Sequence, residues 1–390
     1  MPTTMALTAA FALALSGCGE GAGTGRGTGA EASGVASAQA RRDGAVRAAV
    51  RRLADEGDAP GAAALIRNGD GGTRFVATGV ADVRTGRRIH RSDHFRAGSL
   101  TKTVIAAVTL RLAAEKRLGL DDSVEKHLPG LVRGQGNNGL NITLRQLLNH
   151  TSGLFDYAAD PALVRQLSTG PGRTRTPAAL VRTALRHRPY AVPGAQWRYS
   201  NTNYVLLGMV IQRVTGHPYA SEAQHLVLDP LTLTGTSFPG TRTALPAPHG
   251  RAYADSGKGG ARHDVTALNP SSAGAAGELI STLDDLSRLI AGLLRGGSPI
   301  PRAQLRAMRD TSASGGQYGM GLFPVRLSCG VTLWGHNGEI NGSYALAVAT
   351  PDGRHTLAYR LNATTRPTLF AETSFLKAEF CPESATTPPW

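Results

Sequence analysis

The chain has 390 residues, and its 41% of hydrophobic residues against 18% charged ones excludes an intrinsically disordered protein. A chain of this length can bury a large hydrophobic core. The formal net charge of +14 would suit nucleic acid, but the basic residues are scattered and never alternate with aromatic residues in a compact block. We therefore expect no nucleic-acid partner.

Residues 1–17 are typical of an export signal. The apolar stretch from Ala6 to Leu15 is too short to span a bilayer, and the following L-S-G-C resembles the lipobox of bacterial lipoproteins. That resemblance implies cleavage before Cys18 and a lipid on its sulfur. The expected protein is exported and either anchored by this lipid to the outer face of the cell membrane or secreted. No Lys or Arg precedes the apolar stretch, which a misplaced start codon would explain.

The next segments predict a linker and the first part of a folded domain. Residues 18–43 are rich in Gly, Ala, Ser and Thr without an apolar period, which is typical of a flexible linker. A helix is expected from Gly44 to Glu56, where apolar residues recur on one face. Gly61–Ile66 and Arg74–Val80 are strand-like runs separated by G-D-G-G, a hairpin signal, and Asp82–Ile89 predicts a turn and an edge strand.

The stretch F-R-A-G-S-L-T-K-T places Ser99 and Lys102 three residues apart, directly before an apolar run. If a helix begins at Ser99, this spacing brings hydroxyl and ammonium onto one face, beside unpaired backbone N–H groups at the helix N-terminus. This is the Ser-x-x-Lys arrangement of acylating serine hydrolases.

The middle of the chain, residues 120–282, is mostly helical in pattern and has long loops. The clearest apolar helices are expected at Ile142–Asn149 and Tyr204–Thr215, and another follows at Leu283–Leu294. The pattern changes after Tyr318. Strands are then expected at Val331–Gly335, Ser343–Thr350 and His355–Leu361, followed by a closing helix at Thr368–Phe380. Strands at both ends predict one sheet assembled from the two terminal parts.

Two later stretches supply partners for the Ser-x-x-Lys pair. Tyr199 and Asn201 lie in Y-S-N, directly before an apolar helix, and His336 lies in H-N-G at the end of an expected strand. A serine hydroxyl needs a base beside it. Lys102 could have a lowered pKa or hold a tyrosine as phenolate, and Tyr199 is the candidate general base.

The remaining positions have expected roles in binding. In extended chain Asn201 would point the same way as Tyr199 and donate to a substrate amide carbonyl. His336 would form a polar or cationic wall, and Gly338 would let a substrate backbone approach the strand. The backbone N–H groups of Ser99 and Glu339 are the candidate oxyanion hole.

Together these stretches make the sequence resemble the penicillin-recognising serine hydrolases, and most of all their class C β-lactamase and D-alanyl-D-alanine carboxypeptidase branch. Further matches are L-L-N-H-T-S-G-L at 147–154, Y-S-N-T-N-Y-V-L-L-G at 199–208, S-A-G at 272–274, Y-G-M-G-L at 318–322 and L-S-C-G at 327–330. The resemblance implies an α/β (α+β sandwich) domain over residues 44–381, followed by a tail at 382–390. Its antiparallel sheet would be flanked by helices and carry an inserted all-helical lobe, with the site in the cleft between them.

The resemblance also implies acylation of Ser99 followed by deacylation, without a metal or other cofactor. The expected enzyme is a D-alanyl-D-alanine carboxypeptidase or a related β-lactamase of the cell envelope. Its partners would be a small peptide, ester or β-lactam substrate, and peptidoglycan, and we expect a monomer. The pair His90 and His94 lacks the glutamate of a metal-binding H-E-x-x-H motif, so no metal site is expected there.

The sequence departs from the carboxypeptidase pattern after His336. Those enzymes place hydroxyl residues around the following glycine, which with an arginine hold the terminal carboxylate of the substrate. Here Asn337 and Glu339 occupy these positions. A glutamate would repel a carboxylate, so an esterase, a D-amino-acid amidase or peptidase of the same fold is an alternative. A surface protein that binds penicillin without turnover is a further one.

With Cys18 lipidated, two cysteines remain. In an exported protein Cys329 and Cys381 are expected to form a disulfide, with two buried free thiols as the alternative. Secreted carboxypeptidases of the branch named above also carry a disulfide near the C-terminus.

Overall fold

The computed structural model describes residues 43–169, 172–255 and 262–381. The expected signal, Cys18, nearly all of the linker and the tail lie outside the described residues, so these assignments stay predictions. Among the described helices, none is long and apolar enough to cross a membrane.

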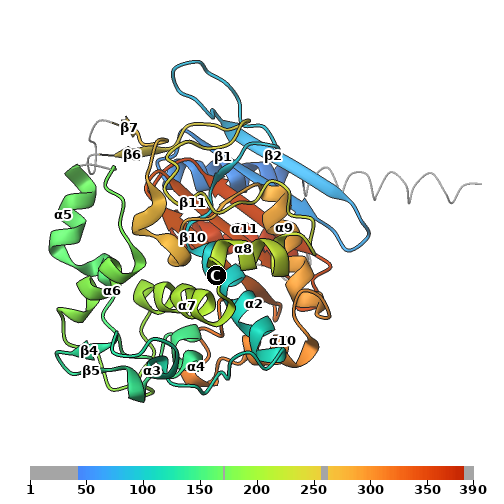
Figure 1. Ribbon diagram of the computed structural model, residues 1–390. Coiled ribbons are helices and arrows are strands. Elements are labelled where there is room, and N and C mark those ends of the chain that lie inside the picture. Colours follow the sequence, from blue (N-terminus) through green and yellow to red (C-terminus); the bar gives the residue numbers. More distant parts are fainter. Residues whose placement is uncertain (1–42, 170–171, 256–261, 382–390) are drawn as a thin grey trace, which may run out of the picture. The chain divides into compact units, whose positions relative to one another are not determined.

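A six-stranded antiparallel sheet has the order β2-β1-β12-β11-β10-β9 (Figure 1). The strands are β1 Gly61–Arg67, β2 Thr73–Gly79, β9 Phe323–Arg326, β10 Thr332–Ile340, β11 Ser343–Ala349 and β12 Thr356–Leu361. β1 pairs with β12, with Ala64 opposite Tyr359. The expectation of one sheet built from both terminal parts is confirmed.

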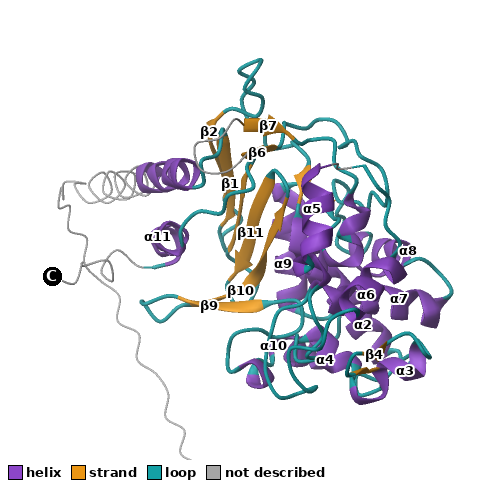
Figure 2. Cartoon of the chain, turned by 90° about the vertical axis from the view of Figure 1, so that its left-hand side faces the viewer, coloured by secondary structure: helices purple, strands orange, loops and turns teal. Residues whose placement is uncertain are grey.

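Helices cover both faces of this sheet. The helix over residues 43–56 and α11 (Leu369–Phe380) pack on one face, and α9 (Leu283–Arg295) packs on the other, where the remaining helices also lie (Figure 2). Alternate residues of a strand point to opposite faces. Leu65 of β1 accordingly joins the core on the α9 side, whereas Ile66 joins the core under α11. Burial on both faces explains why β1 is a continuous apolar run.

The helical side of the molecule is organised around α2 (Thr101–Ala114), which is buried on nearly every side and packs against α7 (Asn201–Thr215). Its sequence is apolar all round, which is typical of a central core helix. The other helices are α3 Val124–His127, α4 Leu144–Leu148, α5 Pro161–Thr169, α6 Pro177–Leu185, α8 Tyr219–Ala223 and α10 Arg302–Arg309.

The structure corrects two expectations and adds one strand. His336 does not end a strand, because β10 continues for four residues beyond it, to Ile340. The segment Asp82–Ile89 is a turn with one isolated bridge and adds no strand to the sheet. β9 was not anticipated; it contains Pro324, which is tolerated there because β9 is an edge strand.

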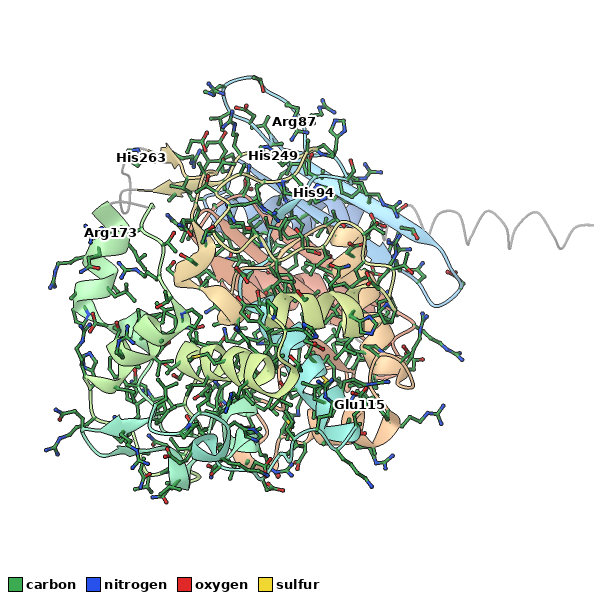
Figure 3. All side chains as sticks on the ribbon, in the orientation of Figure 1. Arg87, His94, Glu115, Arg173, His249 and His263 are labelled. Carbon is green, nitrogen blue, oxygen red and sulfur yellow. A yellow bond between two sulfur atoms is a disulfide. The ribbon has the colours of Figure 1, made fainter. Side chains whose placement is uncertain are left out.

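His94, one of the two histidines excluded as a metal site, forms an isolated backbone bridge with His249. Figure 3 labels both residues. The short strands β6 (Tyr253–Asp255) and β7 (Arg262–Asp264) pair with each other. His94 Nδ1 lies 3.0 Å from the carbonyl oxygen of Pro248. This contact gives His94 a structural role without a metal ion.

Cys329 lies between β9 and β10, and Cys381 follows α11. The two sulfur atoms lie at bonding distance, and the Cα atoms are 5.9 Å apart, within the usual range for a disulfide. A disulfide here would tie the edge of the sheet to the helix that covers it.

We predict that Cys329→Ser lowers the free energy of unfolding by about 3–4 kcal/mol, because a disulfide with a sequence separation of 52 restricts the unfolded chain. Denaturant unfolding without reductant measures this change, and Cys381→Ser is the matched control and should give the same loss. Finding two reactive thiols besides Cys18 in the denatured wild-type protein would contradict the disulfide.

Candidate active site

A tight turn presents Ser99 between the sheet and α2. Residues Gly98–Leu100 form a single 3₁₀ turn that runs directly into α2. Gly98 has a φ of +54°, and a Cβ atom there would lie 2.6 Å from the backbone nitrogen of Glu339 on β10. Only glycine fits this turn, because both the dihedral angle and the close approach exclude a side chain.

Lys102 lies on the first turn of α2 and is fully buried. Its Nζ is 3.0 Å from Ser99 Oγ, 2.8 Å from Asn201 Oδ1 and 2.6 Å from the carbonyl oxygen of Ala276. The expected proximity of hydroxyl and ammonium is confirmed. Burial lowers the pKa of Lys102 from 10.5 to about 7, and the Asp156 carboxylate opposes part of that shift.

These three contacts determine what a neutral Lys102 can do. A neutral amine has two N–H groups and one lone pair. Asn201 Oδ1 and the Ala276 carbonyl can only accept hydrogen bonds from Nζ, so they take the two N–H groups. The lone pair is then left for the proton of Ser99, which makes Lys102 the candidate general base.

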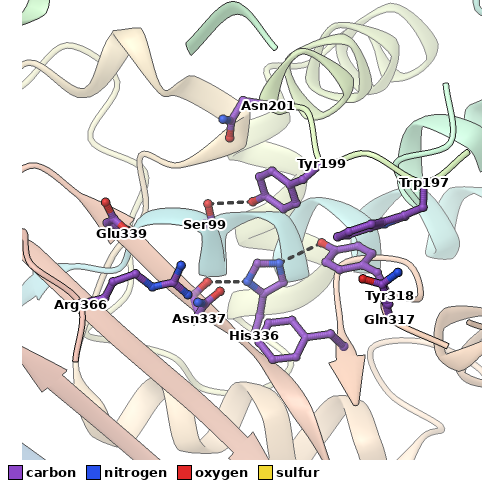
Figure 4. A pocket seen from close by; sticks show the side chains of 11 residues that line it. Ser99, Trp197, Tyr199, Asn201, Gln317, Tyr318, His336, Asn337, Glu339 and Arg366 are labelled. Carbon is purple, nitrogen blue, oxygen red and sulfur yellow. Dashed lines mark hydrogen bonds between the residues drawn. The ribbon is translucent and has the colours of Figure 1, made fainter. Parts of the chain in front are cut away.

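Tyr199 also reaches the nucleophile, with its hydroxyl 2.9 Å from Ser99 Oγ (Figure 4). Burial raises the pKa of Tyr199, the hydrogen bond to Ser99 opposes part of this shift, and the Asp156 charge adds to it. The expectation of a phenolate base at Tyr199 is therefore wrong for this resting site, because the phenol stays protonated at neutral pH. Tyr199 is suited to donate a proton, and its ring is held by His150, with ring centroids 4.2 Å apart.

Asn201 was expected in extended chain. It is instead the first residue of α7. Its side chain still faces the site, where Asn201 lines both cavities beside Ser99. The amide nitrogen Nδ2 lies 3.2 and 3.0 Å from the two carboxylate oxygens of Asp156. The donor expected to bind a substrate carbonyl is thus already engaged within the protein.

His336 lies in the middle of β10, one position from Asn337. Its Nε2 is 2.9 Å from the hydroxyl of Tyr318, and Nδ1 contacts the carbonyl oxygen of Asn337. Burial lowers the pKa of His336 to about 3. The polar wall expected here is present, but the cationic form is not, because the imidazole is neutral at physiological pH.

The two backbone N–H groups proposed for the oxyanion hole come from segments in direct contact. A Cβ atom on Gly338 would lie 1.8 Å from the carbonyl oxygen of Ala97 and 3.0 Å from the backbone nitrogen of Ser99. The absence of a side chain at Gly338 therefore lets β10 touch the turn that carries the nucleophile. This contact places the N–H groups of Ser99 and Glu339 at the same edge of the site.

Two cavities meet at Ser99. One, of about 590 Å³, is walled by aromatic and polar side chains, and the other, of about 370 Å³, is more apolar. Ser99, Asn201 and Glu339 line both. The first is also lined by Trp197, Tyr199, Gln317, Tyr318, Phe323, His336, Asn337 and Arg366, and the second by Tyr157, Leu167, Leu268, Ser272, Ala273 and Ile340, among others. A nucleophile between two cavities can hold an acyl group in one and its leaving group in the other.

Several residues of the site were not assigned a role from the sequence. His150 and Tyr318 stood in the matching stretches without one, and Asp156 follows the first of these stretches by two residues. Arg366 precedes α11, and no motif around it in the sequence indicated a role in the site. Phe323 and Trp197 are aromatic residues of the cavity wall that spacing alone could not place.

Comparison with known proteins agrees with this geometry. The sequence matches the model of the Beta-lactamase family over residues 46–380, and the chain belongs to this family. It is a serine hydrolase of the β-lactamase fold, as the resemblance implied.

The similar proteins include an amidohydrolase and an esterase. A D-stereospecific amidohydrolase from Streptomyces sp. is 42% identical, with a TM-score of 0.80, and the match covers 87% of this chain and 98% of that one. Protein flp of Staphylococcus aureus (strain N315) is 33% identical over 184 residues, which is 47% of this chain and 36% of that protein. Esterase EstB of Burkholderia gladioli is 34% identical over 169 residues, or 42% of this chain and 43% of the esterase. The chain thus matches less than half the length of these two relatives.

We predict that kcat/KM rises with pH along an acid limb with its midpoint at about pH 7, because Lys102 must be neutral to accept the Ser99 proton and is protonated below its pKa. Rates with a nitrophenyl ester that has no titrating amine, measured between pH 5 and 9, give the limb. Tyr199→Phe should lower the rate but keep the midpoint. A rate that falls as the pH rises through 7 would be inconsistent with a lysine base.

Proposed function

We propose that this protein hydrolyses amides of D-amino acids that carry a free α-amino group, through an acyl-enzyme on Ser99. The D-stereospecific amidohydrolase from Streptomyces sp., 42% identical over nearly its whole length, supports this substrate class. The esterase relative suggests that small esters are also accepted.

The observation that carries the proposal is the engaged donor of Asn201. A substrate with an acylamino group needs a hydrogen-bond donor for its amide carbonyl. Here the N–H groups of Asn201 Nδ2 face Asp156, at 3.0 and 3.2 Å. The Asn201 amide therefore has no free donor for an acylamino carbonyl, which favours a substrate with a free amino group.

Glu339 supplies a second acceptor for such a group. It lines both cavities, and among the described residues no side chain donates a hydrogen bond to its carboxylate. Burial raises the pKa of Glu339, and the nearby guanidinium of Arg366 opposes this shift. An ammonium group at the border of the two cavities would provide a hydrogen-bond donor for this carboxylate.

The proposed reaction uses the contacts around Ser99. Lys102 accepts the proton of Ser99 as Oγ attacks the amide carbonyl, and the resulting oxyanion lies between the N–H groups of Ser99 and Glu339. Tyr199 donates its proton to the leaving nitrogen as the C–N bond breaks, and the proton that Lys102 took from Ser99 then restores the phenol of Tyr199. Water then attacks the ester of Ser99 by the same route, releasing the free acid and restoring the hydroxyl.

A D-alanyl-D-alanine carboxypeptidase is the second candidate, and Arg366 favours it. This guanidinium faces the larger cavity beside Asn337 (Figure 4). A cation in that position could hold the carboxylate of a leaving D-alanine, a role that the sequence left without a residue.

The location of the enzyme is also a proposal. We propose that the export signal and a lipid on Cys18 direct the enzyme to the cell envelope. Peptidoglycan there contains D-amino acids. Labelling of Cys18 by a radioactive fatty acid tests this location directly.

We expect a hydrolysis panel to rank D-amino-acid amides first, with nitrophenyl esters of short acids next and D-Ala-D-Ala peptides and a chromogenic cephalosporin last. Ser99→Ala should abolish every activity while its melting temperature stays near that of the wild type. Preference for L-amides, or for D-Ala-D-Ala peptides with a free carboxylate, would overturn the amidase proposal in favour of another member of the panel.

We also predict that Glu339→Gln raises KM about ten-fold for a D-amino-acid amide, because an amide side chain cannot form a charge-assisted bond to the ammonium. The N-acetylated substrate, which lacks the charge, should be unaffected. Glu115→Gln, at the far end of α2, is the matched control. Equal losses for both substrates would show that Glu339 does not select the amine.

A further inference from the structure

Asp156 is bound to the site more extensively than any sequence signal suggested. It lies between α4 and α5, where its Oδ1 accepts a hydrogen bond from the backbone N–H of Ala158 at 3.1 Å. The same oxygen accepts from the backbone N–H of Asn201 at 3.2 Å, and both carboxylate oxygens accept from Asn201 Nδ2. One carboxylate thus holds both the backbone and the side chain of the first residue of α7.

This arrangement fixes the orientation of the Asn201 amide. Were the amide turned over, its oxygen would face the two carboxylate oxygens, and no donor would lie between them. With Nδ2 toward Asp156, Oδ1 is left to accept from Lys102 Nζ at 2.8 Å. A continuous chain of hydrogen bonds therefore runs from the carboxylate through the amide to the lysine.

Asp156 is also the one charged partner of Lys102 among the titratable groups around it in the described residues. Burial lowers the pKa of His150 and of His336 and raises that of Tyr199, Tyr204 and Tyr318, so these five groups are neutral at physiological pH. Glu278 follows Ala276 by two residues, but its carboxyl group binds Tyr219 and the backbone N–H of Gly240 instead.

We propose that Asp156 is a positioning residue that acts on Lys102 through Asn201, orienting the amide oxygen toward the lysine and supplying the negative charge that balances it. This inference rests on the acyl transfer proposed above, but not on the choice of substrate. If so, Asp156 sets the pH above which Lys102 is neutral and the enzyme is active. The carboxylate favours the protonated lysine, so removal of the charge lets Lys102 become neutral at lower pH.

The test is the pH dependence of Ser99 labelling by a small uncharged fluorophosphonate, which has no amine to contact Asp156 directly. Asp156→Asn and Asp156→Ser each keep a hydrogen-bond acceptor and remove the charge. We expect the acid limb of the labelling rate to move down by about one pH unit in both variants of the full-length protein. If one of them fails to fold, the other still gives the measurement.

Asp160→Asn is the matched control. Asp160 lies four residues further on, and its carboxylate binds His187 at 2.8 Å rather than a residue of the site. Its limb should coincide with that of the wild type. An unmoved limb in both Asp156 variants, or an upward shift, would overturn the proposal, and a loss confined to amine-bearing substrates would make Asp156 a substrate contact instead. Because the probe lacks an amine, the labelling result can be interpreted even if the amidase proposal fails.

Discussion

The site depends on one buried amine. A lysine removed from water is stable only if its N–H groups have acceptors, because burial without them costs several kcal/mol. Ser99, Asn201 and Ala276 provide these acceptors for Lys102 from three segments that lie far apart in the chain. The same contacts that satisfy the ammonium leave its lone pair facing Ser99 once it is neutral. Stability and reactivity here have a common cause.

The second constraint is the contact between the nucleophile turn and the sheet. Gly98 and Gly338 allow two backbones to approach so closely that neither position accepts a Cβ atom. This contact brings the turn that leads into α2, on the helical side, against β10 of the sheet. The catalytic hydroxyl and the backbone of Glu339 are therefore positioned by main chain alone, and side chains remain free to vary the two cavities around them.

Local patterns were sufficient to predict most of the fold. The strands β1, β2, β11 and β12 and the helices α7, α9 and α11 have periodic apolar residues and clear turn signals, and all were anticipated within a few residues. β9 was missed, because a four-residue edge strand with a proline has no such pattern. Among the site residues, Ser99, Lys102 and Tyr199 could be found because their spacing is short or their motif is distinctive. Asp156 and Arg366 could not, since their roles depend on side chains that meet only in the folded protein. The sequence left open whether His336 is polar or cationic and whether Lys102 or a Tyr199 phenolate is the base, because burial cannot be read from a motif.

The pairing of β1 with β12 has a consequence for biogenesis. Ala62 lies opposite Leu361, so about three hundred residues are synthesised between two neighbouring strands. At roughly 5–20 residues per second, β1 waits on the order of 15 to 60 seconds for its partner to leave the ribosome. During that interval the apolar faces of β1 have no sheet to enter, and β10, which carries His336 and Gly338, does not yet exist. The nascent chain is therefore catalytically silent and has an exposed strand edge until β12 is synthesised.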